Sequence, residues 1–414
     1  MSLIPDTDFD IIIAGGGMVG ASLACALSGR GLRLAVIDGQ VFDSGNIPPR
    51  QTQPSFDARV SAIAPASRDF FRELDVWHDM EAIRVSPYQG MHVWDADGTG
   101  SISFNSADIQ QPELGFIIEN SVILAALHRR LEAVPDVTLI APAMVERIDR
   151  HFSRRDPLAA RTSVHCATGD SFRAALLVAS DGPNSRIRQL AGFRTREWDY
   201  RHQAIVTTVR TELPHGATAL QRFMTSGPLA FLPLTAPQGS DGHYCSIVWS
   251  ILPEQAAELL ALDDEAFAMR LRTAIENRLG AIQWVAPRSG FPLRQRHAVN
   301  YVMDNIVLVG DAAHTIHPLA GQGVNLGLQD ARTLAREIHA NLRNRRAVND
   351  PLMLQRYQRR RVGRNLSMMW MMEGFKFLFA QQSLPYRWAR NAGLSSVDNL
   401  PVLKNRLIRQ AAGY

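Results

Sequence analysis

The chain has little of what builds disulfide-rich or membrane-spanning proteins. Its 414 residues include only three cysteines, Cys25, Cys166 and Cys245, which are far apart and form no C-x-x-C pair. This usage argues against a disulfide framework or a zinc site, so we expect no metal and a reducing compartment. No stretch reaches the roughly 18 consecutive apolar residues that a membrane-spanning helix needs. Aspartates precede the first apolar run, which therefore does not resemble a signal peptide. We expect a cytoplasmic protein.

The chain also lacks a large excess of charge of one sign. The net charge is +4, although the pI of about 9.2 is basic. No aromatic or RNA-motif spacing accompanies the basic residues, and we expect no nucleic-acid partner. Arginines do gather late in the chain, directly before an apolar run at 368–380. This region forms either a solvated or core helix, or a surface for anionic phospholipid or a lipid-carrying partner. The arginines are Arg343, Arg345, Arg346, Arg356, Arg359, Arg360, Arg361 and Arg364.

What the chain does have is a glycine-rich turn between two apolar strands near its start. Gly15, Gly17 and Gly20 form G-x-G-x-x-G, and the second strand ends in Asp38, 23 positions after Gly15. The first glycine permits the tight turn, the second lets a pyrophosphate approach the backbone, and the third lets the helix pack on the sheet. An acid at this distance accepts hydrogen bonds from a ribose diol. The pattern predicts a dinucleotide site.

Two further apolar strands end in motifs that suit a ligand. One ends in Asp181-Gly182, with Ser185 and Arg188 following at three-residue steps. The other ends in Gly310-Asp311 and leads through a Pro/Gly loop to a helix near Asn325. In α/β folds, ligands bind at the carboxyl edge of the sheet, where such loops meet. Each motif alone could be an ordinary turn, but three together predict one binding edge.

The three motifs together resemble those of a known family. The GxGxxG, DGxxSxxR and GDAAHxxxPxxGxGxNxGxxD patterns are similar to those of aromatic flavoprotein monooxygenases with the para-hydroxybenzoate hydroxylase fold, over nearly the whole chain. Stretches such as GMHVWDADG, WDYRHQAIVTTVRTELPH and HTIHPLAGQGVNLG resemble a narrower group, the flavin hydroxylases of ubiquinone biosynthesis. Within that group the likeness is greatest to the bacterial enzymes that hydroxylate C5 of 2-polyprenylphenol.

The resemblance implies an α/β fold: a three-layer, Rossmann-like FAD-binding domain, an inserted α+β substrate domain with a mixed or antiparallel sheet, and a C-terminal helical region. Strand-like patterns at 88–104, 202–210, 229–234 and 243–251 and helical patterns at 119–134 and 253–280 agree with it. The predicted segments are 1–82, 111–190 and 296–345 for the FAD-binding domain, 83–110 and 191–295 for the substrate domain, and 346–414 for the helical region.

The family also implies roles for individual residues. Gly15, Gly17, Gly20 and Asp38 would hold the ADP half of FAD, and Arg59 its phosphates or ribityl chain. Asn120 stands where many relatives have Arg or Gln, so its contact with FAD is a weaker expectation. The second motif would serve FAD and the nicotinamide donor, Asp311 the ribityl or pyrophosphate region, and the third loop the isoalloxazine. The residues of these last sites are Asp181, Gly182, Asp311, Pro318, Gly321, Gly323, Val324 and Asn325.

The chemistry implied is that of the cofactor. NADH or NADPH, bound transiently, would reduce FAD, and the reduced flavin and O2 would give a C4a-hydroperoxide that a phenol ring attacks. His314 and His317 are the candidates for a catalytic base, although either is at least as well suited to a structural role. Pro318 would lie beside the flavin. The predicted substrate residues lie in the strands of the inserted domain, and the aromatic ones Phe223, Phe231 and Trp249 would suit a hydrophobic core equally well. The full set is Arg222, Phe223, Phe231, Tyr244 and Trp249.

Alternative functions remain at this stage. The ring position or the aromatic substrate could differ, an O2-independent flavin reductase could use the same fold, or the chain could be a structural FAD-binding subunit of a biosynthetic assembly. Expected partners are the lipophilic phenol, a membrane surface contacted peripherally at its inner face, a ubiquinone-biosynthesis protein complex, and a second copy of the chain.

Overall fold

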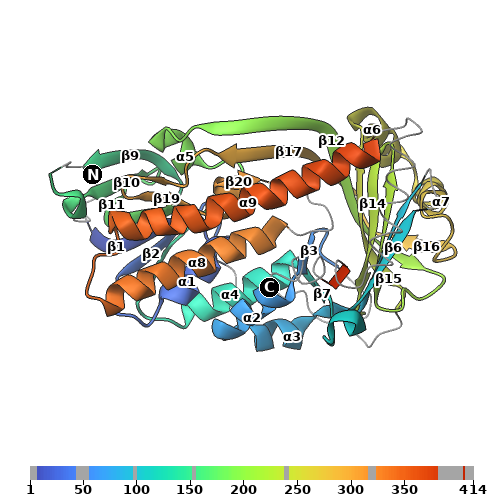
Figure 1. Ribbon diagram of the computed structural model, residues 1–414, viewed down its shortest axis with the longest axis horizontal. Coiled ribbons are helices and arrows are strands. Elements are labelled where there is room, and N and C mark those ends of the chain that lie inside the picture. The colour runs from blue at the N-terminus through green and yellow to red at the C-terminus, as the bar shows by residue number, and fades with distance from the viewer. Residues whose placement is uncertain are drawn as a thin grey trace.

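Two large sheets, joined by long strands and one long helix, make up the protein (Figure 1). The structure is a computed structural model, and it describes residues 7–42, 56–96, 100–151, 155–236, 242–315, 323–380 and 404–405. Within these ranges no helix is long and apolar enough to cross a membrane. His317, Pro318 and Gly321 lie outside the described residues.

The first sheet has eight strands and a parallel centre. Its order is β18-β19-β11-β1-β2-β8, in which β19, β11, β1, β2 and β8 run parallel to one another and β18 is antiparallel to β19. The central strands are continuous apolar runs because both faces are covered. Their bounds are Thr7–Ala14 (β1), Leu34–Ile37 (β2), Val137–Ile140 (β8), Ser171–Ala179 (β11), Val302–Met303 (β18) and Ile306–Leu308 (β19), with Val145–His151 (β9) and Arg161–Cys166 (β10) paired antiparallel alongside.

Helices α1, α4 and α8 pack together beside this sheet (Figure 1). They span Met18–Leu27 (α1), Asn120–Glu132 (α4) and Gly323–Arg343 (α8). A small three-stranded sheet, β3-β7-β4, lies between this half and the second large sheet, with helices α2 and α3 beside it. Its elements are Val60–Ile63 (β3), Ser86–Tyr88 (β4), Gly115–Glu119 (β7), Pro65–Glu73 (α2) and Trp77–Ile83 (α3).

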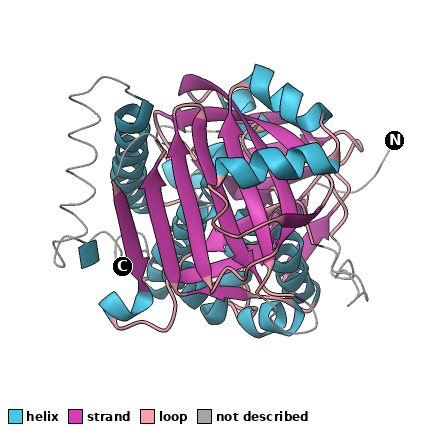
Figure 2. Ribbon diagram, turned by 90° about the vertical axis from the view of Figure 1, so that its right-hand side faces the viewer, coloured by secondary structure: helices cyan, strands magenta, loops and turns pink. Residues whose placement is uncertain are grey.

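The second large sheet has nine strands, mostly antiparallel, in the order β20-β17-β12-β15-β14-β13-β5-β6, with β16 paired to β12. Figure 2 shows its broad face with helices lying against it. The bounds are Gly90–Asp95 (β5), Ser101–Asn105 (β6), Thr195–Thr211 (β12), Thr218–Met224 (β13), Gly227–Leu234 (β14), Tyr244–Ile251 (β15), Ile282–Val285 (β16), Ser289–Ala298 (β17) and His314–Thr315 (β20).

Helices complete this half and the end of the chain. Pro253–Ala261 (α6) and Asp264–Ala274 (α7) cover the outer face of the second sheet, Arg186–Ala191 (α5) follows β11, and Pro351–Ala380 (α9) runs along both halves (Figure 1). The expected helix at 253–280 is therefore two helices, because Asp263 caps α7 by accepting from Ala266 N, and the chain turns after Ala274. Short 3-10 turns lie at Ser106–Ile109, Pro157–Ala159 and Gly310–Ala312 (η3).

These elements confirm the predicted fold class. The six segment limits stay a prediction, and β17 runs across the limit set at residue 295. Cys25, Cys166 and Cys245 are buried free thiols.

Candidate active site

The glycine turn after β1 is shaped by three different constraints. Gly15 has φ +103°, and a Cβ there would collide with the backbone of Ser180. A Cβ on Gly20 would collide with the carbonyl of Gly15. Gly17, the residue before α1, has no atom within 4 Å of its would-be Cβ. The turn therefore leaves open space at Gly17, beside the unpaired N–H groups of the first helical turn, where a phosphate group fits.

Asp38 closes this turn from the end of β2. Its Oδ2 accepts from Gly16 N at 2.6 Å and its Oδ1 from Gln40 N at 2.8 Å. A carboxylate has about four lone-pair sites, so acceptor capacity remains for a ribose diol. The structure thus brings Asp38 and the glycine turn together, whereas the ribose contact itself stays a prediction.

The motif after β11 is a connector as well as a ligand edge. Asp181 Oδ2 accepts from Ile187 N at 3.1 Å, and Ser185 Oγ caps α5 by accepting from Arg188 N at 3.0 Å. The buried Arg188 donates to the carbonyls of Ala312 and Pro183, both at 2.9 Å. This explains the DGxxSxxR spacing, because it ties the end of β11 to the loop after β19. Asp181 Oδ1 is buried and has no partner within the described residues, which fits a donor from a bound cofactor.

The third motif places Asp311 at the same sheet edge. Gly310 adopts φ +59°, and its N–H donates to Asp330 Oδ2 at 3.0 Å. Asp311 is exposed, but nearby protein desolvates its carboxyl and raises its pKa, while His314 and Arg59 act in the opposite direction. The charge of Arg59 thus acts on Asp311, and their shared role toward the ribityl or pyrophosphate region stays a prediction.

His314 is enclosed rather than open to a substrate. Its ring is 1% exposed, and its Nε2 lies 2.5 Å from Oδ2 of the fully buried Asp330. Arg361 Nε donates to the other oxygen of Asp330 at 2.6 Å, and Asn365 Nδ2 does so at 3.1 Å. Burial alone would raise the pKa of Asp330, but the charges and hydrogen bonds of His314 and Arg361 lower it to about 2. This network favours the structural alternative for His314, and it fastens α9 to the loop after β19.

The start of α8 contacts the small sheet. Asn325 Oδ1 accepts from Ala64 N at 2.9 Å, and its Nδ2 donates to Ala62 O at 2.7 Å. Asn120 Oδ1 accepts from Ser61 Oγ at 2.7 Å. Both amides therefore position β3, and a contact with FAD stays a prediction for each. Gly323 begins α8 and Val324 packs against the main core.

Sequence reasoning missed the pair that holds the Arg59 segment. Glu119 is buried, and its two oxygens accept from Arg84 Nε at 2.5 Å and Arg84 Nη2 at 2.8 Å. Glu119 Oε1 also accepts from Asp57 N at 2.6 Å. The side chain of Arg59 then points outward, 5.5 Å from the ring centroid of Phe291 on β17. The only signal in the sequence was an acid directly before Asn120.

The second sheet separates the five predicted substrate residues by face. Phe231 and Trp249 belong to the core beneath α6 and α7, where Trp249 contacts Phe267. Arg222 Nη1 donates to Ala274 O at 2.6 Å, and its Nη2 lies 2.9 Å from Glu276 Oε1. These three residues therefore stabilise the outer layer, which agrees with the core alternative for Phe231 and Trp249, and a substrate role for any of them stays a prediction. Alternate residues of a strand point to opposite faces, so neighbouring positions on these strands belong to different layers.

Tyr244 and Phe223 lie on the other face, which is turned toward the small sheet and the first half. Tyr244 packs in the cluster that contains Ala62 and Ile117 of that small sheet, while Phe223 packs against Val93 and Ile102. The same face carries further side chains that sequence reasoning did not single out. They are Ala219, Ala230 and Leu232, with Met91 and Val248 packed beside them. We call this face, together with Tyr244 and Phe223, the inner face.

Comparison with known proteins decides the family. The family model described as FAD binding domain matches residues 8–369. The chain belongs to this FAD-binding family. It is 35% identical to the 3-demethoxyubiquinol 3-hydroxylase of Escherichia coli, covering 98% of both chains. It is 31% identical to the mitochondrial ubiquinone biosynthesis monooxygenase COQ6 of Xenopus tropicalis, covering 98% of this chain and 93% of that one. The p-nitrophenol 4-monooxygenase of Pseudomonas putida shares the fold, with a TM-score of 0.74, 17% identity and 98% of both chains covered.

The protein is therefore an FAD-dependent monooxygenase of the para-hydroxybenzoate hydroxylase fold. The open space at Gly17 and the orphan oxygen of Asp181 fit the cofactor. When bound, FAD takes electrons from NAD(P)H and supplies the O2 chemistry. Gly17, Asp38, Asp181 and Asp311 are the residues that would hold FAD at the sheet edge.

Proposed function

We propose that this monooxygenase hydroxylates the aromatic ring of a polyprenylated phenol in ubiquinone biosynthesis, at C5 of 2-polyprenylphenol. The observation that carries the ring hydroxylation is the 35% identity, over 98% of both chains, to an enzyme named 3-demethoxyubiquinol 3-hydroxylase. The choice of C5 rests on the motifs that resemble the bacterial C5 hydroxylases. The likeness to the COQ6 proteins of animals supports the same pathway.

The inner face supports a large apolar substrate. Leu232 and Ala230 are buried there, and Val248 is partly buried beside them. An isoprenoid chain held against such side chains would gain about 25 cal/mol per Å² of its own apolar surface removed from water. A ring held against such a face would lie between it and the FAD edge, as hydroxylation requires.

A second candidate is hydroxylation of a demethoxyubiquinol at the ring position for which the Escherichia coli relative is named. The specific observation in its favour is that this relative matches nearly the full length of the chain. The two candidates use the same site and differ only in the ring carbon that is presented.

Quinone extracts of a strain that lacks this protein distinguish them. We expect 2-polyprenylphenol to accumulate, whereas accumulation of a demethoxyubiquinone would favour the second candidate. Complementation with the wild-type gene must restore ubiquinone, and an unchanged quinone profile would contradict both.

Two assays address the remaining alternatives, one with purified protein and one in the strain that lacks it. Oxygen uptake that depends on added phenol separates a hydroxylase from an O2-independent flavin reductase. If the chain were only a structural subunit, a folded variant that has lost FAD, such as Gly17→Val, would still support ubiquinone synthesis. The proposed hydroxylase predicts loss of ubiquinone with that variant.

A further inference from the structure

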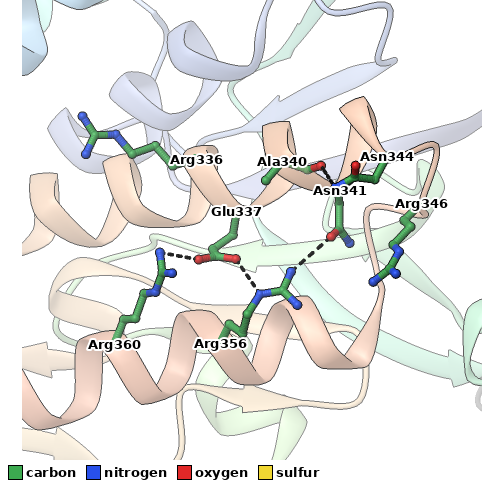
Figure 3. Close-up of a pocket in the computed structure, with 8 residues that line it drawn as sticks. All are labelled: Arg336, Glu337, Ala340, Asn341, Asn344, Arg346, Arg356 and Arg360. Atoms are coloured by element: carbon green, nitrogen blue, oxygen red, sulfur yellow. Dashed lines mark hydrogen bonds and ion pairs between the residues drawn. The ribbon is translucent and has the colours of Figure 1, made fainter.

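A basic pocket lies between α8 and α9, in the part of α8 remote from its start at Gly323 (Figure 3). It has a volume of about 450 Å³ and is lined by Arg336, Arg346, Arg356 and Arg360 around one acid, Glu337. Figure 3 shows Arg356 and Arg360 reaching from α9 to Glu337 on α8, with Arg346 beside them. None of these residues belongs to the FAD edge or the inner face.

The charges in this pocket do not cancel. Glu337 Oε2 lies 2.9 Å from Arg356 Nε, and its Oε1 lies 2.6 Å from Arg360 Nη1. Arg336 is 3.6 Å from Glu73, which is already paired with Arg332. Arg346 is exposed and has no ion pair within the described residues. Two of the four guanidinium groups that line the pocket therefore share the one acid in its lining, and a third lies toward Glu73 outside it. The positive charge exceeds the negative charge, which leaves N–H donors for an anion. Arginine binds phosphate oxygens through paired N–H groups.

The same surface continues onto the outer side of α9. Leu352, Arg359 and Trp370 are spaced by 7 and 11 residues, so they share one helix face. Leu352 is 60% exposed and Trp370 is 71% exposed, which is high for such large apolar side chains. Arg359 is exposed and without an ion pair in the part of the chain that the structure describes. Tryptophan and arginine together are typical of surfaces that contact lipid headgroups.

Arg361, which stands among these arginines in the sequence, is not part of this surface. It is buried and donates to Asp330 and Asn365. Met369 is also buried, whereas its neighbour Trp370 is exposed. The helix therefore divides the arginine cluster between a structural network inside and a charged surface outside.

We propose that this surface, made of Arg336, Arg346, Arg356, Arg359, Arg360 and Trp370 and named here the basic face, docks on a bilayer that contains anionic phospholipid. The phosphate of one headgroup occupies the pocket, and Trp370 and Leu352 enter the interface. The inference goes beyond the proposed function, because docking does not depend on which ring carbon is hydroxylated.

Cosedimentation of the FAD-loaded protein with vesicles tests it, without substrate or turnover. We expect binding to phosphatidylglycerol-containing vesicles at low salt, little binding to pure phosphatidylcholine, and weaker binding at high salt because exposed charges are screened. The double variant Arg346→Ser/Arg359→Ser should lower the partition coefficient roughly thirty-fold, since each basic residue near an anionic surface contributes about fivefold. Its FAD content and melting temperature should match those of the wild type.

The matched control is Arg194→Ser/Arg270→Ser, which removes two exposed arginines before β12 and on α7. It should bind vesicles almost as well as the wild type. Trp370→Phe gives a second measurement, because the blue shift of tryptophan fluorescence on vesicle binding should shrink in this variant. Equal losses in the two double variants, or no binding of wild type to anionic vesicles at any salt concentration, would overturn the proposal. In the latter case delivery of lipid by a partner protein is the better explanation.

Discussion

The two large sheets present their functional groups in different ways. In the first sheet, parallel strands end at one edge, and the loops after β1, β11 and β19 meet there. The groups that matter are backbone N–H groups and short carboxylates whose position follows from where each strand ends. In the second sheet, the groups that matter are side chains on one of two faces, and both faces are covered by protein.

This difference teaches how much a local pattern can specify. A strand end followed by Gly and Asp fixes both the place and the chemistry of a loop. A strand buried on both faces has no polar side to mark its orientation, so neighbouring positions are indistinguishable in the sequence. Arg222 anchors α7, whereas the adjacent Phe223 faces the other way. Four experiments test this contrast between the halves.

The largest effect is expected at the glycine turn. Gly17→Val places a branched side chain where nothing in the protein lies within 4 Å, so the protein should fold but exclude the pyrophosphate. We expect purified protein without flavin absorbance and with apoprotein stability close to that of wild-type apoprotein. Gly20→Val is the matched contrast and should fail to fold, because its Cβ meets the Gly15 carbonyl. Normal FAD occupancy in Gly17→Val would show that this turn does not hold the cofactor.

On the second sheet, the two faces should respond differently to truncation. Phe231→Ala on the outer face should lower the free energy of unfolding by about 3–5 kcal/mol and leave FAD affinity unchanged. Val248→Ala on the inner face, at a partly buried position, should cost about 1 kcal/mol but raise KM for the phenol. Denaturant unfolding and steady-state kinetics measure both. A raised KM for Phe231→Ala with unchanged KM for Val248→Ala would reverse our assignment of the faces.

His297 lies on β17, which runs between the two halves. Burial, helped by the charges of His314 and Arg196 and opposed by Asp330, lowers its pKa from 6.5 to about 4. Above pH 6.5 it contributes no pH dependence. As the pH is lowered from 6.5 to 4, the unfolded chain takes up a proton on this histidine that the folded protein does not. The free energy of unfolding should therefore fall by up to about 1.4 kcal/mol for each unit by which the pH is lowered. His297→Gln should flatten this slope in unfolding curves, and an identical slope would exclude His297 as its source.

The smallest effect concerns Asp311. Asp311→Ala removes an acceptor for cofactor hydroxyls at the sheet edge, and a hydrogen bond to a charged group contributes about 1.5–3 kcal/mol. FAD affinity, measured by titration of the apoprotein, should fall roughly ten- to a hundred-fold. The matched control, Asp304→Ala near β18, should leave FAD affinity unchanged. Equal affinity of wild type and Asp311→Ala would separate this residue from the cofactor.

The sequence by itself determined the first half of the protein in detail. Apolar strands, Gly15, Gly17 and Gly20, and the Asp-containing loops carry their own geometry, because turn conformation and strand ends depend on neighbours along the chain. The family resemblance extended this to the fold class. His317, Pro318 and Gly321 lie outside the described residues, so their predicted roles stay predictions.

Only the tertiary structure decided which side chains share a space. It joined Glu119 to Arg84 and Asp330 to Arg361, contacts between residues 35 and 31 positions apart. It turned Trp249 outward and Tyr244 inward, and it separated buried Arg361 from exposed Arg359. These outcomes depend on strand register and on helix rotation against distant partners, which no local pattern encodes.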